Sequence, residues 1–239
     1  MRKLACLLTA TLLSTWAHAE AAVPRPFSAT YAVSYRGIGA GTITFDFAHD
    51  AATGRYIYET HASPSALARL FVSRAAMERS VMEIDAAGTR PIEWTLDDGK
   101  SGSEKDGELR FDWARNTVSG MVEGEKVELT AEPGTQDRSS IMISVATSLL
   151  RGVEPGTVAL IDDNKIKRYV YAKKESATVD SALGKFDTVI YESAREGGSS
   201  RTSRFWMAPS LEFLPVRAEQ IRKGKVETVM ELQKLERPE

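Results

Sequence analysis

Cysteine is almost absent from this sequence: its one cysteine, Cys6, lies in an apolar run near the amino terminus. Disulfides, thiolate metal sites and cysteine nucleophiles are therefore excluded for the rest of the chain. Histidine is scarce as well, and neither His49 nor His61 has a second histidine at the spacing of a metal-ligand pair. We therefore expect no metal site, and nothing in the sequence indicates a cofactor.

Long hydrophobic runs and an excess of charge are also missing. The chain has 31 basic and 33 acidic residues, a formal charge of −2, without the concentrated basic face that nucleic-acid binding requires. Beyond the run Leu4–Leu13, no segment approaches the roughly 18 apolar residues of a membrane helix. We expect no nucleic-acid partner and no transmembrane segment.

Catalytic motifs are not found either. No serine lies in a G-x-S-x-G or S-x-x-K pattern. Paired carboxylates occur at Asp97-Asp98 and Asp162-Asp163, where we predict hairpin tips exposed to water, although acid-base catalysis needs a carboxyl whose pKa is raised by burial. The glycines of residues 35–41 lie between two predicted strands, which does not fit a phosphate loop. The sequence therefore indicates no catalytic residues and favours a non-enzymatic protein.

The amino terminus has the three parts of a signal peptide. Arg2 and Lys3 form a basic region, Leu4–Leu13 an apolar region, and Ala17-His18-Ala19 a small-residue cleavage site. We predict that residues 1–19 are a signal peptide cleaved after Ala19, so the protein is exported. Residues 20–239 contain no linker, and we expect one β-rich domain and a monomer.

Alternation of apolar and polar residues dominates the remaining chain. It is clear over residues 31–35, 43–47 and 92–96, and in a series of paired segments from 158 to 235 that are separated by short Asp-, Asn- or Gly-containing turns. Residues 73–84 are ambiguous between helix and strand, and we favour strand. The pattern predicts about eleven strands in one antiparallel meander.

Two segments have a helical pattern instead. In the first, Ser63 as N-cap and Pro64 at the first position predict a short helix that contains Leu67, Leu70 and Phe71. In the second, residues 137–151, Asp137 is a suitable N-cap and Gly152 a suitable stop. Apolar residues of this long helix cover an arc of roughly 200°. Because one sheet face cannot cover so wide an arc, we predict a curved antiparallel sheet or half-open barrel wrapped around one long and one short helix.

Several spaced residues, rather than one motif, carry a family resemblance. These residues are Asp137-Arg138-Ser139-Ser140, Glu175, Gly184-Lys185-Phe186, Trp206-Met207-Ala208, Leu214-Pro215-Val216 and Gly224. In order and spacing, they resemble the exported bacterial family called domain of unknown function 3108, over nearly all of the chain from residue 20 on. That resemblance implies an envelope protein of bacteria with two membranes, and hence the periplasm, but no site residues. Separately, the predicted architecture resembles the half-barrels of periplasmic lipoprotein and lipid carriers.

Two functions remain open. In the first, the protein binds an apolar envelope component, such as a lipid or acyl chain, in the concavity of the sheet. In the second, the core is filled and the protein is a structural or interaction domain with an envelope protein as partner. An enclosed apolar void of at least about 300 Å³ beside the long helix would distinguish the first from the second. The predicted ligand-binding residues are Leu67, Leu70, Phe71, Ile141, Met142, Val145 and Leu149.

Basic residues crowd two predicted hairpins, at residues 165–174 and 217–225. If the two hairpins are neighbours, they form a positive patch able to meet anionic headgroups or an acidic partner. The alternative is an ordinary solvated face with acidic residues close by.

Overall fold

The computed structural model describes residues 22–66, 76–100, 102 and 104–238. The predicted signal peptide, residues 1–19, lies outside the described residues. The described chain forms fourteen strands in one sheet, rather than about eleven, with one α-helix and one turn of 3₁₀ helix among the described residues. The strands are β1 (Phe27–Tyr35), β2 (Ile38–Asp50), β3 (Arg55–Pro64), β4 (Met77–Asp85), β5 (Gly88–Asp97), β6 (Gly107–Asp112), β7 (Thr117–Val122), β8 (Glu125–Thr130), β9 (Gly156–Asp162), β10 (Lys165–Ser181), β11 (Gly184–Arg195), β12 (Arg201–Ala208), β13 (Leu214–Arg222) and β14 (Lys225–Glu236).

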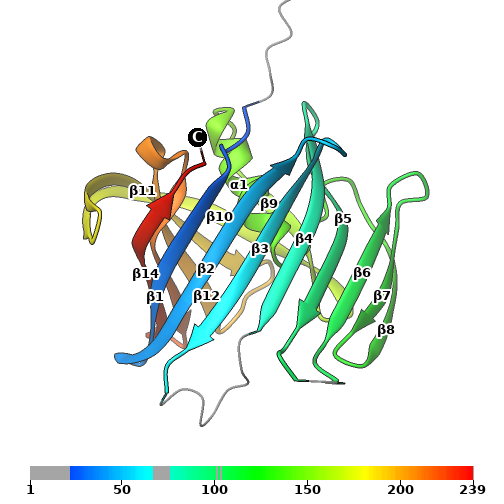
Figure 1. Ribbon diagram of the computed structural model, residues 1–239, viewed down its shortest axis with the longest axis horizontal. Coiled ribbons are helices and arrows are strands. Elements are labelled where there is room, and N and C mark those ends of the chain that lie inside the picture. The colour runs from blue at the N-terminus through cyan, green and yellow to red at the C-terminus, as the bar shows by residue number, and fades with distance from the viewer. Residues whose placement is uncertain (1–21, 67–75, 101, 103, 239) are drawn as a thin grey trace, which may run out of the picture.

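The sheet is an antiparallel meander whose first and last strands pair with each other. Its order is β8-β7-β6-β5-β4-β3-β2-β1-β14-β13-β12-β11-β10-β9, so β8 and β9 are its two edges. The sheet curls until these edges approach each other, because Val127 of β8 shares a buried cluster with Ile161 of β9 (Figure 1). Gln136 fills the remaining gap: its amide donates to the Ala159 carbonyl at 2.8 Å, and its own carbonyl accepts from the Ile161 amide at 2.9 Å. The predicted curved sheet is thus confirmed.

The helix α1 (Ser140–Leu150) connects the two edges and lies inside the curl, where none of its residues is exposed. Asp137 and Ser140 bond each other reciprocally at its start: the Asp137 carboxylate accepts from the Ser140 amide at 2.7 Å, and the Ser140 hydroxyl accepts from the Asp137 amide at 3.0 Å. At its end Gly152 has a φ of 72°, and its amide donates to the Leu149 carbonyl at 3.0 Å. The helix therefore begins at Ser140, and its N-cap is Ser139 and not Asp137 as predicted. Asp137 lies one turn earlier but still bonds the Ser139 and Ser140 amides, and Gly152 follows the end of the helix as predicted. None of the helices among the described residues has the length and apolar character needed to cross a bilayer.

The predicted start of a short helix at Ser63-Pro64 is wrong. Both residues belong to β3, where Ser63 pairs with Thr42 and Pro64 with Gly41 of β2. Pairing over the full length of the hairpin outweighs the local capping signal, and a proline is tolerated at the last position of a strand. Gly41 permits the close approach, since a Cβ atom there would lie 2.3 Å from the Ser63 carbonyl oxygen. The predicted site residues Leu67, Leu70 and Phe71 lie outside the described residues.

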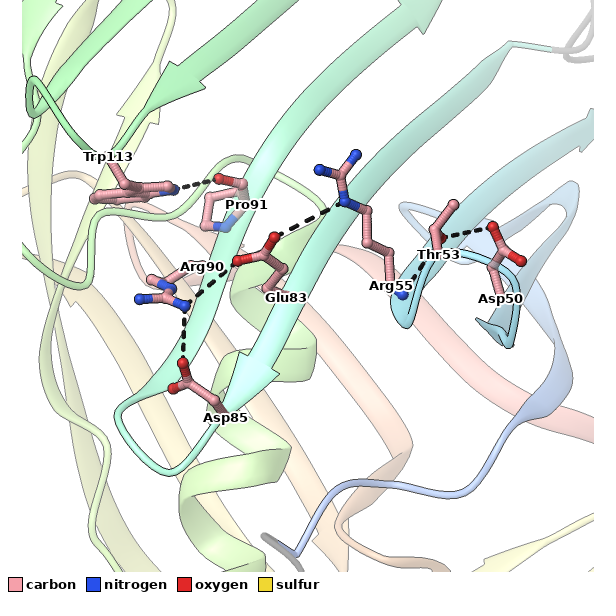
Figure 2. Close-up of polar contacts among 8 residues, drawn as sticks. All are labelled: Asp50, Thr53, Arg55, Glu83, Asp85, Arg90, Pro91 and Trp113. Atoms are coloured by element: carbon pink, nitrogen blue, oxygen red, sulfur yellow. Dashed lines mark hydrogen bonds and ion pairs between the residues drawn. The ribbon is translucent and has the colours of Figure 1, made fainter.

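Two further differences concern strand boundaries. The alternating segments 166–172 and 178–183, which the sequence suggests are two separate strands, both fall largely within the single strand β10, residues 165–181. The ambiguous residues before 85 contain β4, as favoured. On the outer face of β3–β5, Arg90 bonds Asp85 at 2.8 Å and Glu83 at 3.4 Å, and α1 lies behind these strands (Figure 2). Paired charges thus share this outer face with the partly exposed Ile57 and Val81, while Tyr58, Met82 and Trp94 point to the interior.

Candidate functional site

A cavity of about 330 Å³ lies beside α1, inside the part of the curl formed by β1–β3 and β12–β14. Its volume is slightly above the size of about 300 Å³ at which pockets for small ligands begin, but the cavity is partly open to solvent and not the enclosed void expected of a carrier. Aromatic and aliphatic side chains form most of its wall. On the sheet side these include Phe27, Tyr31, Phe45, Tyr58, Leu214 and Met230, and on the helix side Met142, Ile143 and Ala146.

Of the helix residues predicted to bind ligand, Met142 lines this cavity. Ile141, Val145 and Leu149 instead pack against Tyr171, Tyr191 and Met207 in a separate buried cluster. The reason is geometric: residues four apart share a helix face, so Met142 and Ala146 point to one side and the Ile141 set to another. The face of the helix that borders the cavity is therefore the one with Met142 and Ala146, and not the one with Ile141, Val145 and Leu149. That cluster consists of Ile141, Val145, Leu149, Tyr171, Tyr191 and Met207.

An ion cluster closes one end of the cavity. The Glu212 carboxylate accepts from the Arg25 guanidinium at 2.5 Å and pairs with Arg237 at 3.1 Å. Burial alone would raise the pKa of Glu212, but bonds from the amide and guanidinium of Arg25 and the charge of Arg237 hold that pKa below its ordinary value. Glu212 and Phe213 have φ angles of 58° and 59°, unusual for two consecutive residues other than glycine. The ion cluster thus fixes a strained turn at the mouth of the cavity.

A polar group lies at the inner side of the cavity wall. Arg138, which lines the cavity, stacks over Trp94 with its guanidinium carbon 4.8 Å from the ring centroid. Glu78 accepts from the Trp94 indole at 2.7 Å and lies 3.7 Å from Arg138, and Glu123 lies 3.9 Å from it. The Nη2 atom of Arg138 is buried without a hydrogen-bond partner among the described residues. This arginine therefore has hydrogen-bonding capacity left for a ligand.

A buried carboxylate anchors the start of the helix to the sheet. Asp137 is fully buried and accepts a hydrogen bond from the Ser80 hydroxyl of β4 at 2.7 Å. Burial raises the pKa of Asp137 to about 6, although its bonds from the Ser140 and Ser139 amides and from Ser80 act in the opposite direction. Asp137 is thus a carboxylate held in a dry environment.

The carboxylate pairs are held by their own loops. Oxygens of Asp97, Asp98 and Asp106 lie within 4.8 Å of one another and could in principle hold a cation. Backbone amides already bond this group: the Asp98 amide donates to Asp106 at 3.0 Å, and the Lys100 amide to Asp98 at 2.9 Å. The prediction that this pair is exposed is wrong for Asp98, which is 7% exposed because it folds under the loop.

The second pair, Asp162-Asp163, does lie at a hairpin tip, and Lys167 bonds both carboxylates, at 2.7 and 3.0 Å. Lys167 belongs to the first of the two basic hairpins. That hairpin and the second one are not neighbours, because β11 and β12 separate β10 from β13. Arg168 pairs with Glu132 at 2.5 Å, and Arg217 with Glu219 at 2.8 Å. The ordinary solvated face, and not one positive patch, is the observed arrangement.

Sequence reasoning missed the polar segment that leads into α1. Thr135, Gln136, Asp137 and Ser139 are all at most 4% exposed, yet none is apolar. They are buried because they close the gap between the sheet edges, a consequence of tertiary structure that hydropathy does not report. The signal that could have found Arg138 is its place directly after a helix cap, where a long cationic side chain is brought to the concave face.

Comparison with solved structures supports the fold through one protein. A β-barrel-like protein of domain of unknown function DUF1849 from Brucella abortus is similar, with a TM-score of 0.59 and 14% identity over 91% of this chain and 100% of that chain. A candidate exported protein with a YmcC-like fold from Bacteroides fragilis has a TM-score of 0.33 and 11% identity, covering 90% of this chain and 100% of its own. A search of curated proteins found no match.

A candidate lipoprotein from Parabacteroides distasonis, with a TM-score of 0.36 and 10% identity, covers 89% of this chain and 95% of its own. Likenesses at these identities concern the fold alone. The family comparison is more direct, because one family model matches residues 30–232, from β1 through most of β14. On that match the chain belongs to the family described as Protein of unknown function (DUF3108).

Proposed function

We propose that this protein is a non-enzymatic periplasmic protein that binds a lipid or acyl chain in the concavity of its sheet. The observation that carries the proposal is the cavity of about 330 Å³ between α1 and the curl of β1–β3 and β12–β14. Pockets for small apolar ligands have volumes of roughly 300 to 1,000 Å³ and few polar groups. Each methylene buried in such a pocket contributes about 0.8 kcal/mol to binding.

The shape of the wall supports an extended ligand. The lining runs along β1 from Phe27 to Tyr31 and along β13 from Leu214 to Gln220. Because a strand rises about 3.3 Å per residue, seven residues of β13 span roughly 20 Å, the length of a long acyl chain. The periplasmic location is part of the same proposal and depends on the predicted signal peptide.

The test begins with the protein purified from cells. Organic-solvent extraction followed by mass spectrometry should release an acyl-containing molecule, and adding lipid to the delipidated protein should raise its melting temperature. Ala146→Phe, which fills the cavity from the helix side, should abolish both results. Ala87→Phe, at an exposed turn, should change neither. An empty extract together with an unchanged melting temperature would contradict the proposal.

A second candidate function, an interaction domain of the envelope, is favoured by a different observation. Tyr35, Ile38 and Val226 are 47, 61 and 45% exposed, and they lie at the tips of the β1–β2 and β13–β14 hairpins, which are neighbours in the sheet. Exposed apolar side chains that gather in this way are typical of protein contacts. Capture of one stoichiometric envelope protein, lost on Ile38→Ser, would support this function.

A further inference from the structure

We propose that the ligand is an acyl chain whose polar end carries an acceptor oxygen, and that Arg138 and Tyr58 donate hydrogen bonds to this oxygen. The inference rests on the proposed function and specifies its ligand. Both side chains line the cavity, one from the segment before α1 and one from β3. A carboxylate and an ester carbonyl share the required chemistry.

Arg138 is held in place but not saturated. Stacking on Trp94, itself 1% exposed, fixes the plane of the guanidinium. Its separations of 3.7 Å from Glu78 and 3.9 Å from Glu123 are longer than hydrogen bonds. Leaving a buried donor such as Nη2 unbonded costs about 1 to 3 kcal/mol. Almost none of the Nη2 surface faces the free space of the cavity, so a ligand oxygen would remove that cost only with a small shift of the guanidinium.

Tyr58 is a second donor without a partner. It is 5% exposed, its ring stacks on Phe45 with centroids 5.8 Å apart, and its hydroxyl makes no hydrogen bond within the described residues. Tyr31, on the same wall of the cavity, differs in this respect, because its hydroxyl donates to the Pro215 carbonyl at 2.8 Å. Of these two tyrosines, therefore, Tyr58 is the one whose hydroxyl is available to bond a ligand.

The two donors are brought together by the strand register. Tyr58 of β3 lies opposite Ser80 of β4, and Ser80 lies opposite Trp94 of β5, the residue on which Arg138 stacks. Ser80 also bonds Asp137, the residue before Arg138. Burial raises the pKa of Tyr58 most, and the negative charge of Glu78 raises it further. Glu78 also lies 3.7 Å from Arg138, so it is a neighbour of both donors.

The charges around Arg138 define what the ligand must supply. Glu78 and Glu123 already balance the positive charge of the guanidinium, so the site lacks an acceptor atom rather than a negative charge. A carboxylate and an ester carbonyl can both provide that atom, whereas a plain hydrocarbon cannot. The chain of either ligand would then extend from Arg138 along Met142 and Ala146.

The test compares laurate, methyl laurate and dodecane, each displacing the apolar dye N-phenylnaphthylamine from delipidated protein. In the wild-type protein both oxygen-containing ligands should bind about tenfold more tightly than dodecane. Arg138→Met should abolish this preference and leave the affinity for dodecane within about twofold. Tyr58→Phe should reduce it about threefold, and the control Tyr56→Phe, at a neighbouring tyrosine that does not line the cavity, should not change it. Laurate and methyl laurate weakened equally would indicate a neutral acceptor site, and laurate weakened more a carboxylate site.

The outcomes separate this inference from the proposed function. If the wild-type protein binds all three ligands equally, or if Arg138→Met weakens all three alike, the inference is wrong and the apolar cavity still stands. If no ligand displaces the dye, the proposed function fails first. Should Arg138→Met not fold, Tyr58→Phe gives the same comparison, because it keeps the tyrosine ring and leaves the Arg138 guanidinium on Trp94.

Discussion

The two halves of the curled sheet are filled to different degrees. Around β5–β9 the interior is closed, and the space between Trp94, Leu109, Val122 and Ile161 leaves no room for a water molecule. Around β1–β3 and β12–β14 the interior contains the cavity of about 330 Å³. Both halves are lined by apolar side chains, so composition does not produce the difference. The closed cluster contains no residue of α1 and is completed where β8 approaches β9. The apolar side chains of α1 pack instead against β10–β12, and the side of the helix that carries Met142 and Ala146 borders the free space.

The largest expected effect comes from truncating one side chain in each half. Leu109→Ala, in the filled half at 2% exposure, should cost about 3 kcal/mol of unfolding free energy, since the vacated volume cannot collapse. Met230→Ala, at the wall of the cavity, should cost less than about 1.5 kcal/mol because part of its surface has no packing partner. Urea denaturation of both variants measures the difference, and equal losses would contradict the contrast between the halves.

The next effect concerns Asp137, whose carboxylate bonds Ser80 of β4 and so attaches the start of the helix to this strand. Because its folded-state pKa is raised to about 6 from 3.8, the folded protein binds the proton more tightly than the unfolded chain. This carboxyl group therefore contributes most stability below pH 4 and loses it as the pH rises to 6. A shift of this size corresponds to about 3 kcal/mol at most.

Asp137→Asn removes the titration while an amide can still accept from the Ser140 amide and donate to Ser80. Relative to the wild type, the variant should gain up to about 3 kcal/mol between pH 4 and pH 7, measured as unfolding free energy in urea. Parallel pH profiles for the two proteins would show that the carboxyl group is not perturbed.

The antiparallel meander and the two ends of α1 could be predicted because their signals are local. Period-two alternation, the Asp137 carboxylate and the Gly152 stop act within a few residues of their own position. Ser63-Pro64 carried an equally good local signal and was misleading, since pairing with β2 decides that segment. The cavity face of the helix, Met142 and Ala146, could not be predicted, because it depends on which half of the closed sheet α1 contacts.

A smaller effect distinguishes the halves by filling instead of truncation. Ala131→Leu, in the filled half at 2% exposure, should destabilise the protein by about 1 to 3 kcal/mol through overpacking. Ala146→Leu projects into the cavity and should leave stability unchanged or raise it by about 1 kcal/mol, while reducing acyl-chain binding. Thermal unfolding and dye displacement give the two readouts. Destabilisation by both variants would mean that the cavity cannot accept added volume.

The smallest effect on stability is expected at the ion cluster that closes the hollow half. The Arg25 side chain is 70% exposed, so Arg25→Ala should cost about 1 kcal/mol or less. The loss should appear instead in kinetics, as faster release of a bound acyl chain, because Glu212 then holds the strained turn at the cavity mouth with Arg237 alone. Arg36 pairs with Glu227 at 2.6 Å with nearly the same exposures, 62 and 19%, but Glu227 does not line the cavity, whereas Glu212, the partner of Arg25, does. Arg36→Ala should therefore leave the release rate unchanged, and equal acceleration by both variants would show that the ion cluster does not act as a closure.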